Sequence, residues 1–297
     1  MKILDAHSDT ASRILDENKS LFENDLHIDA KRLSINESIQ VFAAFIDPLY
    51  KTSAKERFDS ILDNFYKEAE KCEITICKNY DDIVKEKGKV KAVLSLEGGE
   101  PIETLEDIDY IKSRGVMMIA PTWNFKNRLG CGVLEKEDTG LTEFGKKAIR
   151  RMNDLGIIID VSHLSEKSFW DVCRISNKPI CASHSNSKAV TDNPRNLTDE
   201  QFCKIRDMRG CVGINFYPPF LGNDIKCVID HIDRFLSLGG EDNIGIGSDF
   251  DGVDCLPTGI CGCEDMEKLI KMLPYTEKIR KKIAYENFLR VIQAQNC

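Results

Sequence analysis

Short runs of apolar, largely β-branched residues recur along the chain at intervals that suit alternating strands and helices. The runs predict eight strands: Ile3–Asp9, Gln40–Ile46, Val90–Glu97, Val116–Thr122, Gly156–His163, Pro179–His184, Cys211–Tyr217 and Asn243–Asp249. The charged amphipathic stretches between them predict helices: Ala54–Glu73, Leu105–Arg114, Glu143–Leu155, Glu166–Ser176, Thr198–Arg206 and Lys226–Leu238. The stretch Thr276–Gln293 predicts one long closing helix.

Strands that alternate with helices of this length indicate parallel βαβ units, in an α/β fold. Eight strands favour closure into a (β/α)8 TIM barrel over an open doubly wound sheet. No glycine-rich phosphate-binding fingerprint follows the first strand, so a dinucleotide-binding fold has no support. A barrel typically takes roughly 250 residues, and no linker interrupts the chain, so we expect residues 1–297 to form a single domain.

The charge and hydropathy of the chain narrow the range of partners. The net charge of -8 argues against a nucleic-acid-binding surface and against a basic membrane patch. No run approaches the ~20 apolar residues that span a bilayer, and Met1–Leu4 does not resemble a secretory leader. We therefore expect a cytoplasmic protein that binds neither membrane nor nucleic acid.

The twelve cysteines are scattered rather than arranged as a disulfide framework. Cys181 and Cys211 lie inside apolar, strand-like runs, where cysteine behaves as a small hydrophobe. Only Cys255, Cys261 and Cys263 resemble a soft-metal site, and they lack a second C-x-x-C pair. Free thiols are the preferred interpretation, with a structural zinc as the alternative.

Polar residues recur where the predicted strands end, which is the edge at which barrel enzymes build their active sites. His7 and Asp9 are two residues apart; on a strand they share a face and can chelate one cation, although a polar turn would also explain them. Glu97 ends an apolar strand and precedes two glycines. If it is buried there, the carboxylate needs a partner, and its two oxygens can bridge two cations. The alternative is that it faces solvent.

Histidines mark two further strand ends, at His163 and His184. A single histidine at such a position is more often a satisfied core residue than a ligand. Here three of the five histidines of the chain, counting His7, fall at the same predicted rim. We interpret the other two, His27 and His231, as structural or solvated.

The last predicted strand ends at Asp249, next to the first strand in a closed barrel. A carboxylate there can take a proton from metal-bound water and return it, whereas Asp251 is expected to face the loop and hold the turn at Gly252. The nitrogen and oxygen ligands suit two divalent cations, most simply Zn²⁺, with manganese or cobalt as alternatives. The predicted ligands are His7, Asp9, Glu97, His163 and His184.

In order along the chain, the motifs D-A-H-S-D, E-G-G, D-V-S-H, S-H-S and G-S-D-F-D-G resemble those of the membrane dipeptidase (renal dipeptidase) family, peptidase family M19 of the amidohydrolase-like barrels. The resemblance spans nearly the whole chain. It implies that His7 and Asp9 bind one metal, that His163 and His184 bind the other, and that Glu97 bridges them. Asp249 would then handle protons as the scissile nitrogen departs.

Three more residues enter through the resemblance. Asp192–Asn196 resembles the R-N element of the family, so Arg195 would grip the terminal carboxylate of the substrate, with a loop salt bridge as the alternative. Tyr217 would line the pocket. Trp123 stands where mammalian members carry a histidine thought to stabilise the tetrahedral intermediate, so that role would pass to a metal or to another donor.

Together these features predict a zinc-dependent dipeptidase that hydrolyses dipeptides with a free C-terminal carboxylate through metal-bound hydroxide. Its partner would be a small peptide substrate, and the resemblance leaves a homodimer open. One alternative is another metal-dependent hydrolase of the same fold, acting on an ester, a lactone or a phosphoester. A second is a metal-binding relative without catalysis, which Trp123 keeps open.

Overall fold

A computed structural model describes residues 1–48 and 53–296 of the protein. Its strands are β1 Lys2–Asp5, β2 Glu37–Phe45, β3 Thr75–Cys77, β4 Val90–Glu97, β5 Val116–Ala120, β6 Ile158–Ile159, β7 Cys181–Ala182, β8 Cys211–Ile214 and β9 Ile244–Ile246. Its α-helices are α1 Thr10–Asp16, α2 Ala30–Leu33, α3 Ala54–Lys71, α4 Tyr80–Lys85, α5 Leu105–Ser113, α6 Glu143–Asp154, α7 Glu166–Ile175, α8 Asp199–Asp207, α9 Pro218–Leu221, α10 Cys227–Ser237, α11 Met266–Met272, α12 Glu277–Lys281 and α13 Asn287–Gln293.

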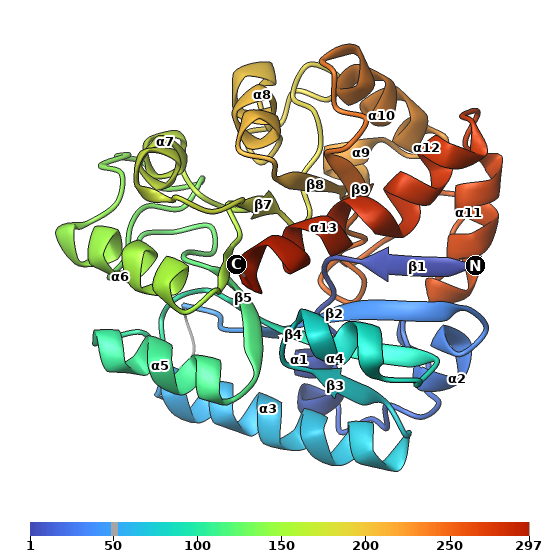
Figure 1. The fold of residues 1–297 in the computed structure, drawn as a ribbon, viewed down its shortest axis with the longest axis horizontal. Coiled ribbons are helices and arrows are strands. Elements are labelled where there is room, and N and C mark those ends of the chain that lie inside the picture. The colour runs from blue at the N-terminus through green and yellow to red at the C-terminus, as the bar shows by residue number, and fades with distance from the viewer. Residues whose placement is uncertain (49–52, 297) are drawn as a thin grey trace.

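Within the described residues, eight parallel strands form a nearly closed barrel surrounded by helices (Figure 1). The strand order is β6-β5-β4-β2-β1-β9-β8-β7, and a bridge between Asp160 and Cys181 joins the two ends. At this bridge the backbone N–H of Val161 donates to the carbonyl of Cys181 at 2.7 Å. The predicted barrel is therefore confirmed. Strand β3, which pairs with β4 outside the barrel path, was not predicted because its three residues are too few for a pattern.

Several predicted strands are longer than the observed ones. The structure ends β1 at Asp5, β6 at Ile159, β7 at Ala182 and β9 at Ile246, so the polar residues that follow lie in loops. The loops turn inward because side chains satisfy backbone N–H groups that a longer strand would have paired. The predicted closing helix is interrupted, because a π-helical segment, Lys282–Glu286, separates α12 from α13.

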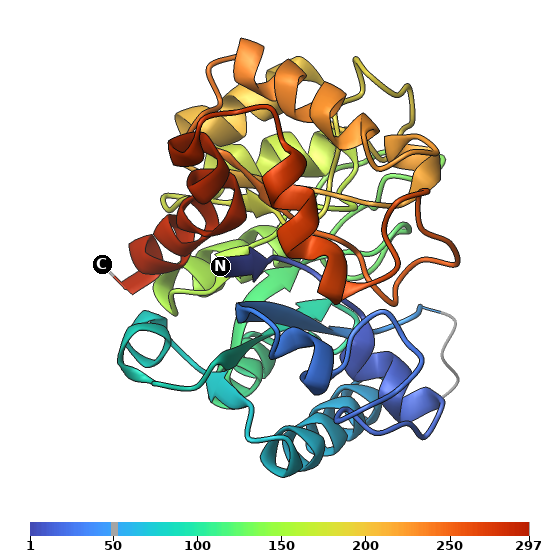
Figure 2. The ribbon, with the colours of Figure 1, turned by 90° about the vertical axis from the view of Figure 1, so that its right-hand side faces the viewer.

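The barrel has an apolar interior that is closed at one end by α13. Leu4, Val93 and Met118 point inward and cluster with Phe288 and Val291 of that helix. A Cβ atom at Gly245 would lie only 2.4 Å from the Phe288 ring, so glycine lets α13 approach the strands. Figure 2 shows the β1 arrow pointing away from α13. The carboxyl ends of the strands therefore gather at the opposite end of the barrel.

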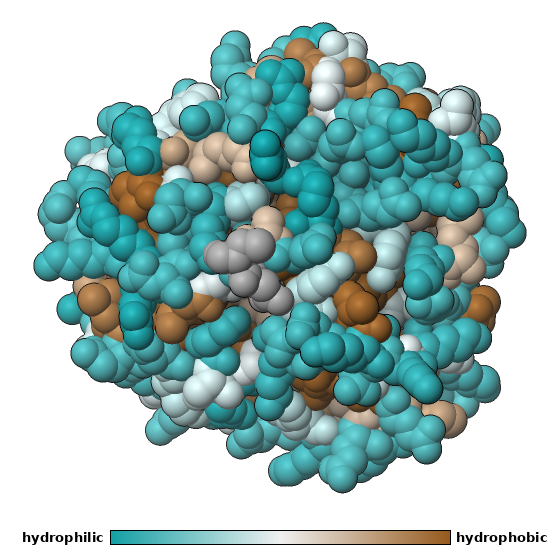
Figure 3. Space-filling model, in the orientation of Figure 1, coloured by the Kyte–Doolittle hydropathy of each residue, from teal (hydrophilic) through white to brown (hydrophobic). Residues whose placement is uncertain are grey.

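The surface is polar on the face shown in Figure 3, where hydrophobic residues appear in small separate groups. Within residues 1–48 and 53–296, every helix is too short or too polar to cross a membrane. The cysteines described by the structure are free, as predicted. Cys181 and Cys211 are fully buried, Cys255 and Cys261 are exposed, and none of the side-chain groups able to hold a metal in this part of the chain includes a cysteine.

Candidate metal centre

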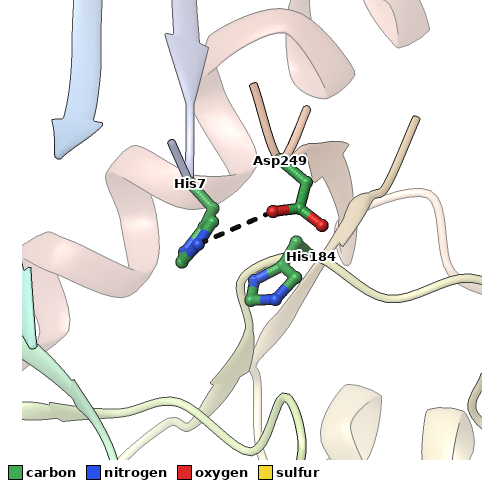
Figure 4. A group of neighbouring side chains, drawn as sticks. All are labelled: His7, His184 and Asp249. Atoms are coloured by element: carbon green, nitrogen blue, oxygen red, sulfur yellow. Dashed lines mark ion pairs between the residues drawn. The ribbon is translucent and has the colours of Figure 1, made fainter. Parts of the chain in front are cut away.

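Six polar side chains converge at the open end of the barrel, each from the end of a strand or the loop after it. Every one is at most 8% exposed. Three overlapping groups of ligand atoms, each within 4.8 Å of one another, can be drawn among them. The residues are His7, Asp9, Glu97, His163, His184 and Asp249. Figure 4 shows His7, His184 and Asp249 facing one another across the centre.

Glu97 lies between two pairs of ligands. Its Oε1 is 2.8 Å from Nε2 of His163 and 3.5 Å from Nε2 of His184. Its Oε2 is 3.4 Å from Nε2 of His7, which is in turn 3.4 Å from Oδ2 of Asp9. Each carboxylate oxygen therefore faces a different pair of side chains, as a bridge between two cations requires.

The donor set fits divalent cations. Among the described residues, His7 Nε2 and Asp9 Oδ1 are buried without a hydrogen-bond partner, which is costly unless something else satisfies them. The Nε2 atoms of His163 and His184 also lie 2.8 Å apart, so both ring nitrogens face the same point in the centre. Imidazole and carboxylate ligands in this mixture suit zinc, and they also suit manganese or cobalt.

For Glu97, His163 and His184 the surroundings favour the protonation state that binds a metal. Burial disfavours charge on Glu97, but His7 and His163 outweigh it and hold its pKa well below the usual range. Burial lowers the pKa of His163 to about 4, with a contribution from Arg195, and also lowers the pKa of His184. Glu97 is therefore ionised and both histidines are neutral, which are the forms that bind a metal.

Two carboxyl groups of the site hold protons more tightly than usual. Burial and the charge of Glu97 raise the pKa of Asp9 to about 6. Burial, with the charges of Asp9 and Glu97, raises the pKa of Asp249 to about 7. Such shifts are typical of functional sites, where a cation or a proton is expected to balance the charge.

His7 and Asp9 meet by a route different from the one predicted. Strand alternation cannot bring them together, because β1 ends at Asp5 and Asp9 already caps α1. Instead the turn after β1 pairs with the loop after β9, through a bridge between Ser8 and Phe250 and a 2.9 Å hydrogen bond from Asp9 N to Phe250 O. On the facing loops, His163 (φ 68°) and Asp249 (φ 63°) adopt left-handed backbone conformations.

Asp251 does more than hold its own turn, so the expectation that it faces the loop is wrong. It is buried, and its carboxylate accepts hydrogen bonds from His27 N at 2.7 Å and from Thr10 Oγ1 at 2.5 Å. His27 is structural, because its Nδ1 accepts from Asp251 N. His231 is also structural: it is fully buried, and its Nδ1 accepts from Ser187 N at 3.0 Å.

A cavity of about 450 Å³ opens onto the metal centre. Glu97, Asp9, His163 and Asp249 of that centre are among the polar residues that line it. Its walls include the aromatic residues Phe45, Trp123, Tyr217 and Phe220. The Trp123 ring packs edge-on against Phe45, at 5.3 Å between centroids, and lies 6.2 Å from the His163 ring. Tyr217, which the resemblance places in the pocket, and Trp123, which replaces the histidine of mammalian members, therefore both line this cavity.

Arg195 lies behind the two histidines and lines a second cavity of about 230 Å³, which shares His163 with the first. Its side chain is buried, and Nε lies 3.2 Å from His163 Nδ1. Its terminal nitrogens donate to Ser185 Oγ at 2.9 Å and to the carbonyl of His184 at 3.1 Å. These partners are neutral, so a loop salt bridge does not account for its position.

The sequence did not reveal the residues that orient the ligands. Asn124 Oδ1 lies 2.8 Å from His163 Nδ1, and Ser183 Oγ lies 2.7 Å from His184 Nδ1. Asn215 Nδ2 donates to Asp249 Oδ2 at 2.8 Å. Ser183 and Asn215 directly follow β7 and β8, and Asn124 lies in the loop after β5, so position behind a strand is the signal that could have singled them out.

A model of the family described as "Membrane dipeptidase (Peptidase family M19)" matches residues 1–297. The chain belongs to this family. It is therefore an M19 metallopeptidase, with the barrel fold of the amidohydrolases and buried clusters that can bind metal.

Two solved structures of metallopeptidases superimpose on 99% of the chain. A dipeptidase of family M19 is 28% identical, with a TM-score of 0.91 and coverage of 99% of this chain and 98% of that one. A metallopeptidase from Rhodobacter sphaeroides, solved with a phosphinate mimic of the dipeptide L-Ala-D-Ala, is 26% identical, with a TM-score of 0.89 and 99% coverage of both chains.

Among curated sequences, an uncharacterized protein of Klebsiella pneumoniae is 38% identical over 204 residues, which are 63% of this chain and 75% of that protein. An uncharacterized dipeptidase of Schizosaccharomyces pombe is 29% identical over 303 residues, which are 90% of this chain and 72% of that protein. The name of the Schizosaccharomyces pombe protein agrees with the family that the model over residues 1–297 shows.

Proposed function

We propose that the protein is a zinc-dependent dipeptidase that hydrolyses dipeptides with a free C-terminal carboxylate. The observation that carries the proposal is the position of Glu97, with Oε1 toward His163 and His184 and Oε2 toward His7. His7 and Asp9 would hold one Zn²⁺, His163 and His184 would hold a second, and Glu97 would serve both. Two such cations polarise a carbonyl and activate water at neutral pH.

Asp249 is suited to carry the proton in this reaction. Its Oδ1 lies 3.9 Å from His7 Nε2, at the edge of the centre, and its Oδ2 is held by Asn215 Nδ2. A general base works best when its pKa is close to the working pH, and burial raises the pKa of Asp249 to about 7. Asp249 would accept a proton from the attacking water and donate it to the leaving amine.

The surroundings favour a small peptide as the substrate. Trp123, Tyr217 and Phe220 give the cavity at the metal centre apolar walls, which exclude water from the reacting bond. The Rhodobacter sphaeroides relative binds a dipeptide mimic at 26% identity over 99% of this chain. Arg195 would contribute its remaining N–H groups to the C-terminal carboxylate, a recognition that a neutral ester or lactone does not need.

The test is turnover of a panel of L-L and L-D dipeptides by the zinc-loaded protein, with Asp249→Asn as the matched variant. We expect hydrolysis by the wild type and a kcat about 10²–10⁴-fold lower in the variant, because the amide keeps the size of the side chain but cannot shuttle a proton. Mass spectrometry should find close to two zinc equivalents in both proteins. Flat traces across the panel, or faster turnover of lactones or phosphoesters, would reject the dipeptidase assignment.

A further inference from the structure

A chain of hydrogen bonds runs from the buried carboxylate of Asp160 through Ser183 to His184. Ser183 Oγ donates to Asp160 Oδ2 in a short hydrogen bond, and it lies 2.7 Å from Nδ1 of His184. All three side chains are at most 2% exposed. The other ring nitrogen of His184, Nε2, faces Glu97 Oε1 at 3.5 Å. This series of hydrogen bonds thus ends on a predicted metal ligand, His184.

The direction of each hydrogen bond follows from what the groups can donate. The Oδ1 atom of Asp160 accepts from the backbone N–H groups of Ser162 and Ser183, both at 2.9 Å. The hydroxyl of Ser183 donates to the other oxygen, Oδ2, so its one proton points at Asp160. The Ser183 oxygen then presents a lone pair to His184, whose Nδ1 must carry the proton. Nε2 is left with its lone pair directed into the centre.

We propose that Asp160 is a positioning residue that acts through Ser183 to fix the tautomer of His184, so that Nε2 is free to bind a metal. The inference rests on the proposed ligand role of His184. Asp160 already joins the loop after β6 to the loop after β7, because its Oδ1 accepts from the backbone N–H groups of Ser162 and Ser183. The inference assigns its other oxygen, Oδ2, a second task. Partners of this kind fix the ring orientation and the tautomer of metal-binding histidines, and their loss typically weakens metal binding about 10–100-fold.

A similar arrangement elsewhere in the barrel provides the control. Asp5, also 2% exposed, accepts from Ser248 N at 2.8 Å, from Ser248 Oγ at 2.6 Å and from His7 N at 3.4 Å. Ser248 precedes Asp249, as Ser183 precedes His184. Among the described residues, however, Ser248 Oγ makes no hydrogen bond to a histidine ring; besides Asp5, its neighbours are the carbonyl of His7 at 3.3 Å and Phe250 N, which donates to it at 3.2 Å. Asp5 therefore joins two strands without setting a tautomer.

The decisive variant is Asp160→Asn. It keeps the shape of the side chain but reverses the direction of the hydrogen bonds that run through Ser183 to His184. The amide oxygen still accepts from both backbone N–H groups, while Nδ2 donates to Ser183 Oγ. The Ser183 proton then turns toward His184 Nδ1, and the ring proton moves to Nε2, where it blocks the metal. We expect nitrogen NMR of the metal-free proteins to show His184 protonated at Nδ1 in the wild type and at Nε2 in the variant. The second zinc should bind about 10–100-fold more weakly to the variant.

Two further variants separate this effect from a loss of packing. In Asp160→Asn/Ser183→Ala the reversing hydroxyl is gone, so His184 can again leave Nε2 unprotonated, and the affinity for the second zinc should rise above that of Asp160→Asn. Asp5→Asn should lower the unfolding midpoint in urea by about as much as Asp160→Asn does. It should leave the His184 tautomer as in the wild type.

Three results would overturn the inference: a wild-type ring protonated at Nε2, a double variant as weak as the single one, or a shifted His184 tautomer in Asp5→Asn. The wild-type spectrum tests it even if Asp160→Asn fails to fold. A wild type that binds no zinc but carries its His184 proton at Nδ1 would refute the proposed metal centre while leaving the role of Asp160 in the tautomer standing.

Discussion

The hydrogen bonds that hold Arg195 determine how many of its N–H groups remain for a substrate. A guanidinium has five N–H donors on three nitrogens, and one N–H of each nitrogen already has a partner, in His163, Ser185 or the His184 carbonyl. Each terminal nitrogen carries a second N–H. Arg195 can therefore support the two histidines and still offer a planar pair of donors to a carboxylate that enters next to His163.

We expect Arg195→Ala to lower kcat/KM for a dipeptide about 100-fold or more, since truncating one partner of a buried charged hydrogen bond costs about 2–5 kcal/mol. The informative measurement compares a dipeptide with its C-terminal amide. The wild type should prefer the free acid, and the variant should lose that preference. If the preference survives in Arg195→Ala, another residue recognises the carboxylate, and Arg195 serves only the histidines.

The six site residues were predictable because the carboxyl ends of parallel strands must meet at one end of a barrel. Any polar residue that directly follows an apolar run is then a candidate, which is how Glu97 and His184 were found. The residues that orient them were not predictable. Whether Ser183 faces Asp160 depends on how β6 and β7 pair, and a two-residue strand such as β7 carries no pattern that fixes its register.

At the scale of elements, the loops that hold the site depend on a close approach between strands. The carbonyl oxygen of Ser183, next to His184, lies where a side chain on β8, or one on the residue directly after β9, would have to be. A Cβ atom would come within 2.0 Å of this oxygen at Gly213 and within 1.7 Å at Gly247. Glycine at these positions is what allows the loop after β7 to lie against the carboxyl ends of β8 and β9.

Gly247→Ala should therefore be among the most damaging single substitutions outside the ligands. The obstacle is backbone rather than a flexible side chain, so we expect a loss of about 3 kcal/mol or more in the free energy of unfolding, together with weaker zinc binding. Gly239→Ala is the control: its φ of 79° is strained for alanine, but the Cβ atom meets only Arg206 Nη1 at 3.4 Å. That variant should lose about 1–2 kcal/mol and keep its zinc. Equal losses in urea unfolding would contradict this explanation.

The strand pattern predicted the architecture better than it predicted the element ends. All eight barrel strands were found because buried parallel strands are nearly continuous apolar runs. The ends were overextended, as in Asn243–Asp249 for the observed Ile244–Ile246, because polar residues that turn inward resemble the last residues of a strand. The π-helical interruption before α13 has no sequence signal that we could identify.

At the scale of the whole molecule, the centre concentrates negative charge in an acidic protein, and protons balance part of it when no cation is bound. Burial disfavours a charged His7, but Glu97 and Asp9 outweigh this effect and raise the pKa of His7 well above its usual value. The pKa of Asp9 is raised to about 6 and that of Asp249 to about 7. Metal binding must displace these protons, so both the stability of the fold and the affinity for the metal depend on pH.

The sign of this linkage can be worked out. Because the folded pKa values of Asp9 and Asp249 exceed the ordinary value of 3.8, the stability that these groups contribute is complete below about pH 4. It is lost as the pH rises through about 6 to 7. The pKa of His163 is lowered to about 4, so its effect on the stability of the metal-free protein is opposite: that stability is lost as the pH falls below about 6.5. The difference between metal-bound and metal-free protein is therefore the proper quantity to measure.

We expect the apparent zinc affinity, and with it the rise in unfolding temperature caused by zinc, to increase as the pH is raised from 5.5 to 8. Calorimetry in buffers of different ionisation enthalpy should detect more protons released per zinc at pH 6 than at pH 8, since Asp9 and Asp249 are already ionised at the higher pH. Asp249→Asn should release fewer protons at pH 6 than the wild type, because its amide carries none to lose. A zinc-induced shift that is the same at every pH would show that these carboxyl groups do not border the metal.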